Sequence, residues 1–556
     1  MIGLIAKPED HEVAREFFEL FKTPWEFYRP EERYDVLVCV SEELPAGSVP
    51  EAKLIIVYAG QELRYDCEAK IEIGIHLKGG TLFYHGERFP IYDSLLTFLD
   101  EQKDILEEEQ SRQSAAVRRR AIGENVVRIG YDLFREIRLL LSLGQPLEYA
   151  GIPTVEVHIG LLRDLIVESD IPLVEIPPIP QGYAFIACLT HDVDHPSIRH
   201  HRWDHTAWGF LYRALIGSAL DVLRGRKSIR HLMSNWAAAA RLPFVYLGLA
   251  RDFWLDFDRY LSIEQHVGST FFVLPFKGDP GRTESGSAPH LRASGYGVTD
   301  IDDRIQAVMR DGGEIGLHGI DAWVDNTSAE GEKTQIEKVT GAPIDGVRMH
   351  WLYFNSESPV LLEKAGFAYD STVGYNETVG YRAGTTQVYK PINATHLLEL
   401  PMHVMDTALF YPTYLGLSSE EAAKRVDTLI ENAMRLGGVL TFNWHDRSIA
   451  AERLWGDLYA RLLDTLKGTG AWCTSATRVV TWFQKRRSVA FRKSDRGMEV
   501  DFNNVAINTN DGGPSLRVRV YNSQGSTEGV RSLYVDIALT IDHMCVTPTA
   551  ASCICS

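Results

Sequence analysis

Short apolar runs and segments with helical spacing follow one another along the middle of the chain. From about residue 182 to 485, each apolar run ends in a polar cluster, and a helical pattern follows it. The apolar runs begin near Phe185, Ser269, Glu314, Gly346 and Val439. This alternation favours a parallel sheet whose chemistry lies at the carboxyl ends of the strands. We therefore expect an α/β barrel over residues 182–485.

Local signals mark the ends of several helices in this region. Thr299-x-x-Asp302 and Ser418-x-x-Glu421 have the spacing of capping boxes. Ser358-Pro359 places proline in the first turn of a helix, where it is favoured. Two glycine pairs, at 312–313 and 437–438, predict helix ends.

Different patterns flank the central region. Residues 1–150 alternate short strands with helices and predict a small N-terminal α/β domain, with a helical connector from about 107 to 143. The proline-rich stretch 176–180 predicts a linker. Period-two alternation over 490–556 predicts a small C-terminal β appendage.

Composition and charge narrow the classes of partner. The 556 residues are 45% hydrophobic and 24% charged, with a formal net charge of −18. A globular protein with this charge has no overall positive field to attract nucleic acid, so we expect no nucleic-acid partner. No apolar run reaches about 18 residues, the first ten residues lack a basic leader pattern, and seven scattered cysteines suggest reduced thiols. A cytoplasmic location is the expectation.

A long insertion at 199–254 interrupts the central region after its first strand. Between residues 199 and 230 it holds seven Arg or Lys against two Asp, and apolar residues lie between them. A basic amphipathic helix of this kind fits peripheral contact with an anionic membrane, at its inner face. A solvated helical lid over a substrate cleft fits the pattern equally well.

Ionisable side chains gather where the predicted strands end. The first strand delivers Thr190-His191-Asp192-Val193-Asp194-His195, and later strands deliver His318, Arg348 with His350, and His445. Two carboxylates flanked by imidazoles are the parts of a metal site with a general base beside it. If the strands close into one barrel, these clusters meet at one rim and predict a hydrolase.

Over residues 182–485 this set resembles the polysaccharide deacetylases, the NodB-homology family or carbohydrate esterase family 4. The resemblance implies an irregular (β/α) barrel of seven or eight strands that binds a divalent metal, Zn²⁺ in particular. It also implies that Asp192 is the general base, that Asp194 is a metal ligand in an Asp-x-Asp form of the first motif, and that His318 opens the family's His-x-x-x-His motif.

The second histidine of that motif is replaced by Ala322. We therefore expect His350 to be the third metal ligand, together with Asp194 and His318. The alternatives for the third ligand are Asp321, His195, His403 or a water molecule. A lost ligand also fits a catalytically dead relative.

The resemblance implies further roles. Arg348 orients the base, Asp370 tunes the catalytic histidine, and His445 is the general acid that protonates the departing amine. The side chains expected to contact the sugar are Trp323, Trp351, Tyr353 and Arg382.

These features predict a metal-dependent deacetylase that hydrolyses the N-acetyl group of an amino sugar. The expected substrate is a polysaccharide or a lipid-linked glycan precursor of the cell surface. A distant likeness to the deformylase that acts on lipid-linked aminoarabinose, which also has Asp-x-Asp and Gly-Leu-His, agrees with a membrane-associated substrate. The alternatives are a deformylase or amidase that acts on a non-polymeric substrate, and a catalytically dead, sugar-binding relative.

Overall fold

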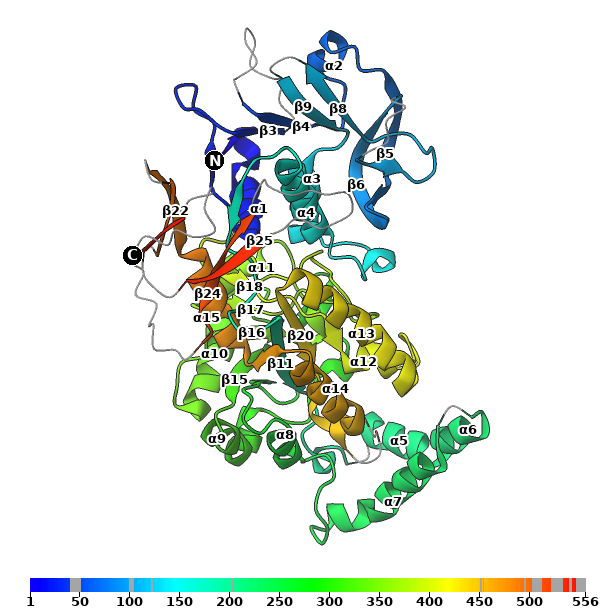
Figure 1. Cartoon of the computed structure of the whole chain (residues 1–556). Helices are drawn as coiled ribbons and strands as arrows, with labels where there is room; N and C mark the ends of the chain where they lie inside the picture. The colour runs from blue at the N-terminus through cyan, green and yellow to red at the C-terminus, as the bar shows by residue number, and fades with distance from the viewer. Residues whose placement is uncertain are drawn as a thin grey trace. The chain divides into compact units, whose positions relative to one another are not determined.

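The computed structural model describes residues 1–40, 52–99, 105–121, 124–202, 204–225, 227–450, 453, 455–494, 497–502, 513–521, 534–539 and 543–546. The chain forms two compact units (Figure 1). One comprises Met1–Gly182, Ala383–Thr385 and Trp482–Ser556, and the other comprises Tyr183–Arg382 and Thr386–Thr481.

The second unit is built on a curled sheet in which all strand pairs are parallel. Among the described residues the sheet has nine strands in the order β18-β17-β16-β15-β12-β11-β20-β19, with β21 also paired to β11. The strands are β11 (Phe185–Val193), β12 (Thr270–Val273), β15 (Glu314–Gly319), β16 (Gly346–Met349), β17 (Tyr369–Asp370), β18 (Leu398–Glu399), β19 (Val404–Met405), β20 (Val439–Asn443) and β21 (Ala471–Thr474). We expected seven or eight strands. That number came from the family resemblance, and the count here includes β17, β18 and β19, which have two residues each.

Strand β11 is the centre of this sheet. All nine of its residues are buried, which explains why its sequence is an apolar run without alternation. β20 pairs along one edge of β11, while β21 and β12 pair with successive parts of the other edge. The carboxyl end of β11 therefore lies between the ends of β12 and β20.

Helices follow most of these strands, and their ends test the predicted signals. They are α8 (Phe257–Ile263), α9 (Asp302–Arg310), α10 (Asn326–Thr340), α11 (Ser358–Lys364), α12 (Asp406–Phe410), α13 (Ser419–Leu436), α14 (Gly456–Gly468) and α15 (Ala476–Arg487). The capping box at Ser418 is confirmed, and α13 ends at Gly437, whose φ is 79°. The capping box expected at Thr299 is wrong, because a 3-10 turn over Val298–Ile301 precedes α9 and Asp300 caps that turn.

The insertion after β11 folds into what we call the helical hairpin, residues 204–249. One arm is α5 (His205–Tyr212), continued by a π-helical turn (Arg213–Gly217) and α6 (Ser218–Leu223); the other is α7 (Ile229–Tyr246). Figure 1 shows α6 and α7 side by side, projecting from the part of the unit that carries the sheet.

The first unit contains a six-stranded sheet in the order β2-β1-β3-β4-β9-β8. Its strands are β2 (Trp25–Phe27), β1 (Ile2–Ile5), β3 (Val36–Val40), β4 (Leu54–Tyr58), β9 (Glu124–Ile129) and β8 (Ala116–Ala121). A smaller sheet holds β5 (Ile73–Tyr84), β6 (Glu87–Phe98) and β7 (Glu107–Glu108), and the helices are α1 (His11–Phe21), α2 (Arg64–Glu68), α3 (Leu133–Ser142) and α4 (Thr154–Val167).

The helical connector expected over 107–143 is wrong for most of its length. β7, β8 and β9 occupy it, and the helix α3 starts only at Leu133. Three consecutive arginines of this segment, Arg118, Arg119 and Arg120, lie in β8. β9 pairs with β4, which is distant in sequence, and with β8, which precedes it. This pairing between strands decides that the segment is extended and not helical.

The alternating C-terminal segment forms strands in the first unit. β24 (Leu516–Tyr521) pairs with β25 (Tyr534–Leu539) and with β10 (Leu173–Glu175), which lies ahead of the second unit in the sequence. β22 (Val489–Ser494), β23 (Gly497–Phe502) and β26 (His543–Val546) make a separate antiparallel sheet. The expected β appendage is thus joined to the N-terminal part of the chain by strand pairing.

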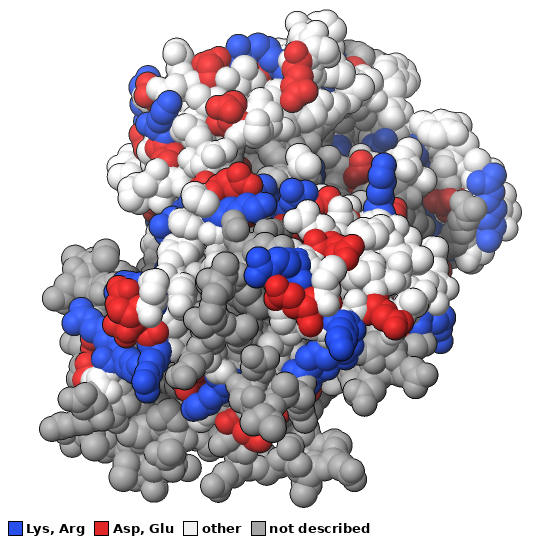
Figure 2. Space-filling view, turned by 90° about the horizontal axis from the view of Figure 1, so that it is seen from above, with Lys and Arg blue, Asp and Glu red and all other residues white. Residues whose placement is uncertain are grey.

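Two further features are the distribution of charge on the surface and the apolar content of the helices. On the face shown in Figure 2, Lys and Arg lie interspersed with Asp and Glu. None of the helices in the described part of the chain combines the length and the apolar content that crossing a bilayer requires.

Candidate active site

The carboxyl ends of four strands of the same sheet meet around one cavity in the second unit. Asp194 follows β11, His318 lies in β15, His350 follows β16 and His445 follows β20. The cavity has a volume of about 860 Å³. The predicted site residues that line it are Asp192, Asp194, His318, His350, Trp351, Tyr353 and His445.

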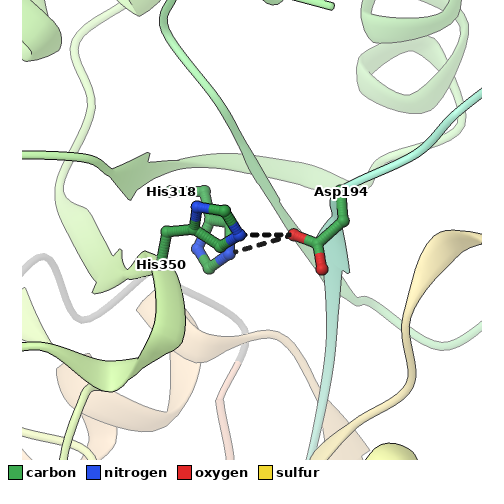
Figure 3. A group of neighbouring side chains, drawn as sticks. All are labelled: Asp194, His318 and His350. Atoms are coloured by element: carbon green, nitrogen blue, oxygen red, sulfur yellow. Dashed lines mark ion pairs between the residues drawn. The ribbon is translucent and has the colours of Figure 1, made fainter. Parts of the chain in front are cut away.

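Asp194, His318 and His350 form a triangle of metal-binding side chains at this cavity. Asp194 Oδ1 is 3.4 Å from His318 Nε2 and 3.6 Å from His350 Nε2, and the two imidazole centroids are 5.0 Å apart. Figure 3 shows both imidazoles facing the same carboxylate oxygen. The three donor atoms lie within 4.8 Å of one another, so one cation can be shared by all three.

The bonding of these side chains fits a divalent cation. Asp194 Oδ1 is buried and has no hydrogen-bond partner among the described residues. His318 Nδ1 is 2.9 Å from the carbonyl oxygen of Arg348, which orients the ring and leaves Nε2 for the triangle. One carboxylate and two imidazoles are also a familiar protein ligand set for catalytic zinc.

Electrostatics favour the ionised carboxylate and the neutral imidazole that a metal requires. Burial raises the pKa of Asp194, but His318, His350 and His445 together hold it well below its usual value. Burial lowers the pKa of His350 to about 3, even though Asp194 opposes the shift. Both groups are therefore in their ligand forms at neutral pH.

Of the alternatives for the third ligand, His350 is the residue that lies in the triangle. His195 Nδ1 is 3.1 Å from His201 Nε2, and His403 Nδ1 accepts the backbone N–H of Thr441. Asp321 forms an ion pair with Arg282. Ala322 is fully buried and offers no donor.

The backbone after His350 is held in an unusual conformation. Trp351 and Leu352 have φ values of 65° and 56°, a region that side chains other than glycine rarely adopt. Arg292 is buried, and its Nη2 donates to the carbonyl oxygens of His350 and Ile320 at 2.8 and 2.9 Å. These bonds fix the loop that presents His350 and Trp351 to the cavity.

Asp192 lies beside the triangle, and two side chains hold its carboxylate, one positively charged and one neutral. Arg348 Nη1 donates to its Oδ1 at 2.9 Å, and Asn443 Nδ2 donates to its Oδ2 at 2.7 Å. Burial raises the pKa of Asp192, but Arg348, then His318 and His445, bring it below its usual value. The carboxylate therefore stays ionised, as a general base must be.

His445 lies near the second carboxylate oxygen of Asp194, with its Nε2 3.7 Å from Oδ2. Its Nδ1 is 2.5 Å from Asp406 Oδ1. Burial lowers the pKa of His445, but Asp406 and then Asp194 and Asp192 raise it to about 10. The imidazole therefore retains its proton at neutral pH.

The structure corrects the residue expected to tune this histidine. Asp370 accepts a hydrogen bond from Thr372 Oγ1, and among the described residues no hydrogen bond or ion pair joins it to His445. The carboxylate on His445 is Asp406, at the start of α12. Burial, opposed by Thr372, raises the pKa of Asp370 to about 6.

Two of the four expected sugar contacts lie away from the cavity. Trp351 and Tyr353 line it. Trp323 is 3% exposed and packs in the apolar core of the unit. Arg382 donates to the carbonyl oxygen of Gly374 and lies over the ring of Phe354.

Sequence reasoning missed Asn443 and Asp406. Asn443 is the last residue of β20, two positions before His445, so the same strand end supplies both. Asp406 follows β19, a strand of two residues that gives no recognisable pattern. Only the pairing of β19 with β20 brings Asp406 to His445.

Comparisons with known proteins report likeness in fold. No family model matches the chain. No curated protein matches it either. Solved structures similar to the chain include polysaccharide deacetylases of carbohydrate esterase family 4.

Three of these structures illustrate the likeness. A protein from Mycobacterium smegmatis described as a polysaccharide deacetylase has a TM-score of 0.34 and 16% identity, covering 56% of this chain and 95% of its own. The family 4 carbohydrate esterase from Streptomyces lividans, in complex with acetate, has a TM-score of 0.25 and 13% identity, over 53% and 93%. Puue allantoinase has a TM-score of 0.34 and 12% identity, over 55% and 92%. At these values the likeness does not assign a reaction.

Replacement of His350 by alanine tests the triangle. We expect metal affinity to fall by more than about 100-fold, the upper end of the loss that removal of an outer-shell partner causes. Elemental analysis of bound Zn²⁺, with His396→Ala on the exposed surface as the matched control, measures the effect. Retention of the wild-type metal content by His350→Ala contradicts the assignment.

Proposed function

We propose that this protein is a metal-dependent hydrolase that removes the N-acetyl group from an amino sugar in a glycan or in a lipid-linked glycan precursor. The observation that carries the proposal is that a carboxylate suited to act as base and an imidazole suited to act as acid both lie within 4 Å of the ligand triangle. Asp192 lies 3.9 Å from His318 Nε2, and His445 lies 3.7 Å from Asp194. Both groups line the same cavity.

Asp194, His318 and His350 would hold a divalent cation, Zn²⁺ being the first choice for this donor set. When bound, such an ion supplies Lewis acidity, lowering the pKa of water and polarising a carbonyl group. The remaining chemistry belongs to protein side chains. Asp192 accepts a proton from the attacking water, and Arg348 and Asn443 keep its carboxylate ionised and oriented.

His445 supplies the proton that the leaving nitrogen needs. Asp406 holds Nδ1, so Nε2 is the atom that faces the cavity. The water oxygen bonds to the acyl carbon, the C–N bond breaks, and the amine leaves with the proton from His445 while the acyl group leaves as acetic acid, which ionises to acetate in water. Asp192 and His445 thus take and give one proton each.

The apolar face of the helical hairpin favours a substrate at a membrane surface. Large apolar side chains on it are exposed to solvent, which is costly unless a partner covers them. They are Trp208, Tyr212, Leu215, Ile216, Leu220, Leu223, Ile229, Met233, Trp236, Phe244, Leu247 and Leu249. Exposed cations accompany them at Arg202, Arg224, Lys227, Arg230 and Arg241.

The occupant that matches both properties is an anionic bilayer, such as the inner face of a plasma membrane. Other hairpin residues, among them Phe210, Ser218, His231 and Asn235, line the cavity. One element therefore supplies both an exposed apolar surface and a cavity wall. A lipid-linked sugar could then reach the site while its lipid stays in the bilayer.

Asp192→Asn tests the base. We expect kcat/KM for acetate release from N-acetylglucosamine oligomers to fall by about 10²- to 10⁴-fold, because proton transfer from water is lost. Metal content is expected to stay at the wild-type level. Asp427→Asn, on the exposed face of α13, is the matched control.

The same assay separates the alternatives. Formate release from N-formyl sugars without acetate release indicates a deformylase. Sugar binding without release of either acid, by protein that contains metal, would falsify the hydrolase proposal and indicate a binding protein.

Asp406→Asn tests the acid through the pH profile. Asp406 raises the pKa of His445, so its loss lowers that pKa. Because the protonated imidazole is the active form, the alkaline limb of the kcat/KM profile should move to lower pH. Asp370→Asn is expected to leave that limb in place, and a shift of equal size in both variants would contradict the assignment to Asp406.

Vesicle binding tests the hairpin. We expect wild-type protein to co-sediment with phosphatidylglycerol vesicles more than with phosphatidylcholine vesicles, and less at high salt. Leu223→Glu with Met233→Glu should weaken binding by about tenfold or more, since burial of two apolar side chains is lost. Leu143→Glu, an equally exposed apolar residue in the other unit, is the control. Unchanged sedimentation of the double variant rules out this surface.

A further inference from the structure

Two arginines and a tyrosine form a polar cluster in the wall of the cavity, apart from the ligand triangle. Arg447 and Arg453 follow β20, and Tyr411 follows α12; all three line the cavity. Nη2 of each guanidinium donates to the hydroxyl oxygen of Tyr411 at 3.1 Å. We call these residues the arginine pair with Tyr411.

Within the described part of the chain, no carboxylate pairs with the positive charge of this cluster. Among the described residues, no carboxylate lies within ion-pair distance of Arg447 or Arg453. By contrast, the buried Arg348 and Arg128 pair with Asp192 and Asp66 at 2.9 Å. Cations in a concave, partly buried wall attract anions more strongly than the same cations do on an open surface.

The adjacent carboxyl group does not neutralise the pair. Asp446 Oδ2 accepts the backbone N–H of His195, and Asp446 Oδ1 is buried without a partner. Burial and then Asp194 raise the pKa of Asp446 to about 7, so it is partly protonated at neutral pH. The arginines in turn outweigh the effect of burial and lower the pKa of the Tyr411 hydroxyl to about 7, which is consistent with a local positive potential.

Aromatic rings hold both guanidinium groups in place. Arg447 Cζ lies 5.4 Å from the ring centre of Trp254. Arg453 Cζ lies 4.5 Å from that of Trp455 and 5.3 Å from that of Tyr411. Stacked arginines lose little freedom when they bind a planar or tetrahedral oxyanion, because their forks are already oriented.

We propose that Arg447, Arg453 and Tyr411 form a subsite for an oxyanion carried by the substrate, either a phosphate ester or a carboxylate. The inference rests on the proposed function and deepens it, since it makes the substrate an acidic N-acylated sugar. Each guanidinium donates N–H groups to the oxyanion, and a protonated Tyr411 hydroxyl can donate its own hydrogen.

The place of the subsite orients the substrate. Arg447 is two residues beyond His445, in the 3-10 turn Asp446–Ile449 that His445 precedes, so we place the anionic group on the acid side of the cavity. The acyl group then points toward Asp194, His318 and His350. A neutral sugar would leave the two arginines without the partner they need and would bind more weakly.

Calorimetric titration measures this preference without turnover. The probes are glucose 1-phosphate, glucuronate and neutral glucose, each titrated into wild-type holoenzyme, Arg447→Gln and Arg453→Gln. We expect each substitution to weaken binding of the preferred acidic sugar by about tenfold or more. Binding of neutral glucose should change by less than about threefold. Arg310→Gln, exposed at the end of α9, is the matched control.

Two further measurements test the subsite when metal has been removed and when a variant does not fold. Inorganic phosphate is titrated into chelator-treated protein, where binding that persists in wild type and disappears in Arg453→Gln locates the anion at the arginines. If Arg453→Gln does not fold, as judged by its thermal melt, Arg453→Lys replaces it, because lysine keeps the charge but not the planar fork. The same direction of loss is expected.

The outcomes separate this inference from the hydrolase proposal. Equal binding of acidic and neutral sugars, or loss of acidic-sugar binding on chelation with no effect of the arginine substitutions, overturns the subsite. Arginine-dependent binding by a protein that releases neither acetate nor formate supports the subsite and contradicts the hydrolase. The preference between glucose 1-phosphate and glucuronate identifies the oxyanion.

Discussion

The buried ion pair between Arg348 and Asp192 is the interaction on which the site depends. The Arg348 side chain, fully buried, keeps the Asp192 carboxylate ionised, and the Arg348 carbonyl oxygen fixes the ring of His318. One residue of β16 therefore orients both the proposed base and a proposed metal ligand. Loss of either partner in such a pair leaves an uncompensated buried charge, at a cost of about 3–5 kcal/mol. The parallel sheet makes the pair feasible because the ends of β11 and β16 lie at the same edge, with β12 and β15 between them.

In the ligand triangle, the third donor comes from a different place in the sequence than the second histidine of the family motif. Ala322 occupies the position where the resembling family has its second histidine, and His350 at the end of the next strand supplies the imidazole. This solution needs a loop in which Trp351 and Leu352 adopt positive φ and Arg292 holds the carbonyl of His350. Strained backbone of this kind persists where surrounding bonds fix it, and it is concentrated at functional sites.

Three features with different chemistry meet at the wall of the cavity. Strand ends supply the proposed ligands, base and acid; the helical hairpin supplies an apolar outer face; and the arginine pair with Tyr411 supplies positive charge without a paired carboxylate among the described residues. Each of the three recognises a different part of a molecule: an amide, a lipid and an oxyanion. A single acidic, lipid-linked, N-acylated sugar carries all three parts. The proposed function and the further inference therefore converge on one class of substrate.

The sequence by itself determined the strand-helix order of the central region and the clusters at Asp192, Asp194, His318, Arg348 and His445. These follow from local periodicity, because a buried strand must be apolar and its polar end must lie at the sheet edge. Only the tertiary structure placed His350, rather than the other candidates, beside Asp194 and His318, put Asp406 rather than Asp370 on His445, and left Trp323 and Arg382 outside the cavity lining. It also turned most of the expected helix at 107–143 into strands. Each of these outcomes depends on which strands pair across the sheets, and pairing between segments distant in sequence leaves no periodic signal in either one.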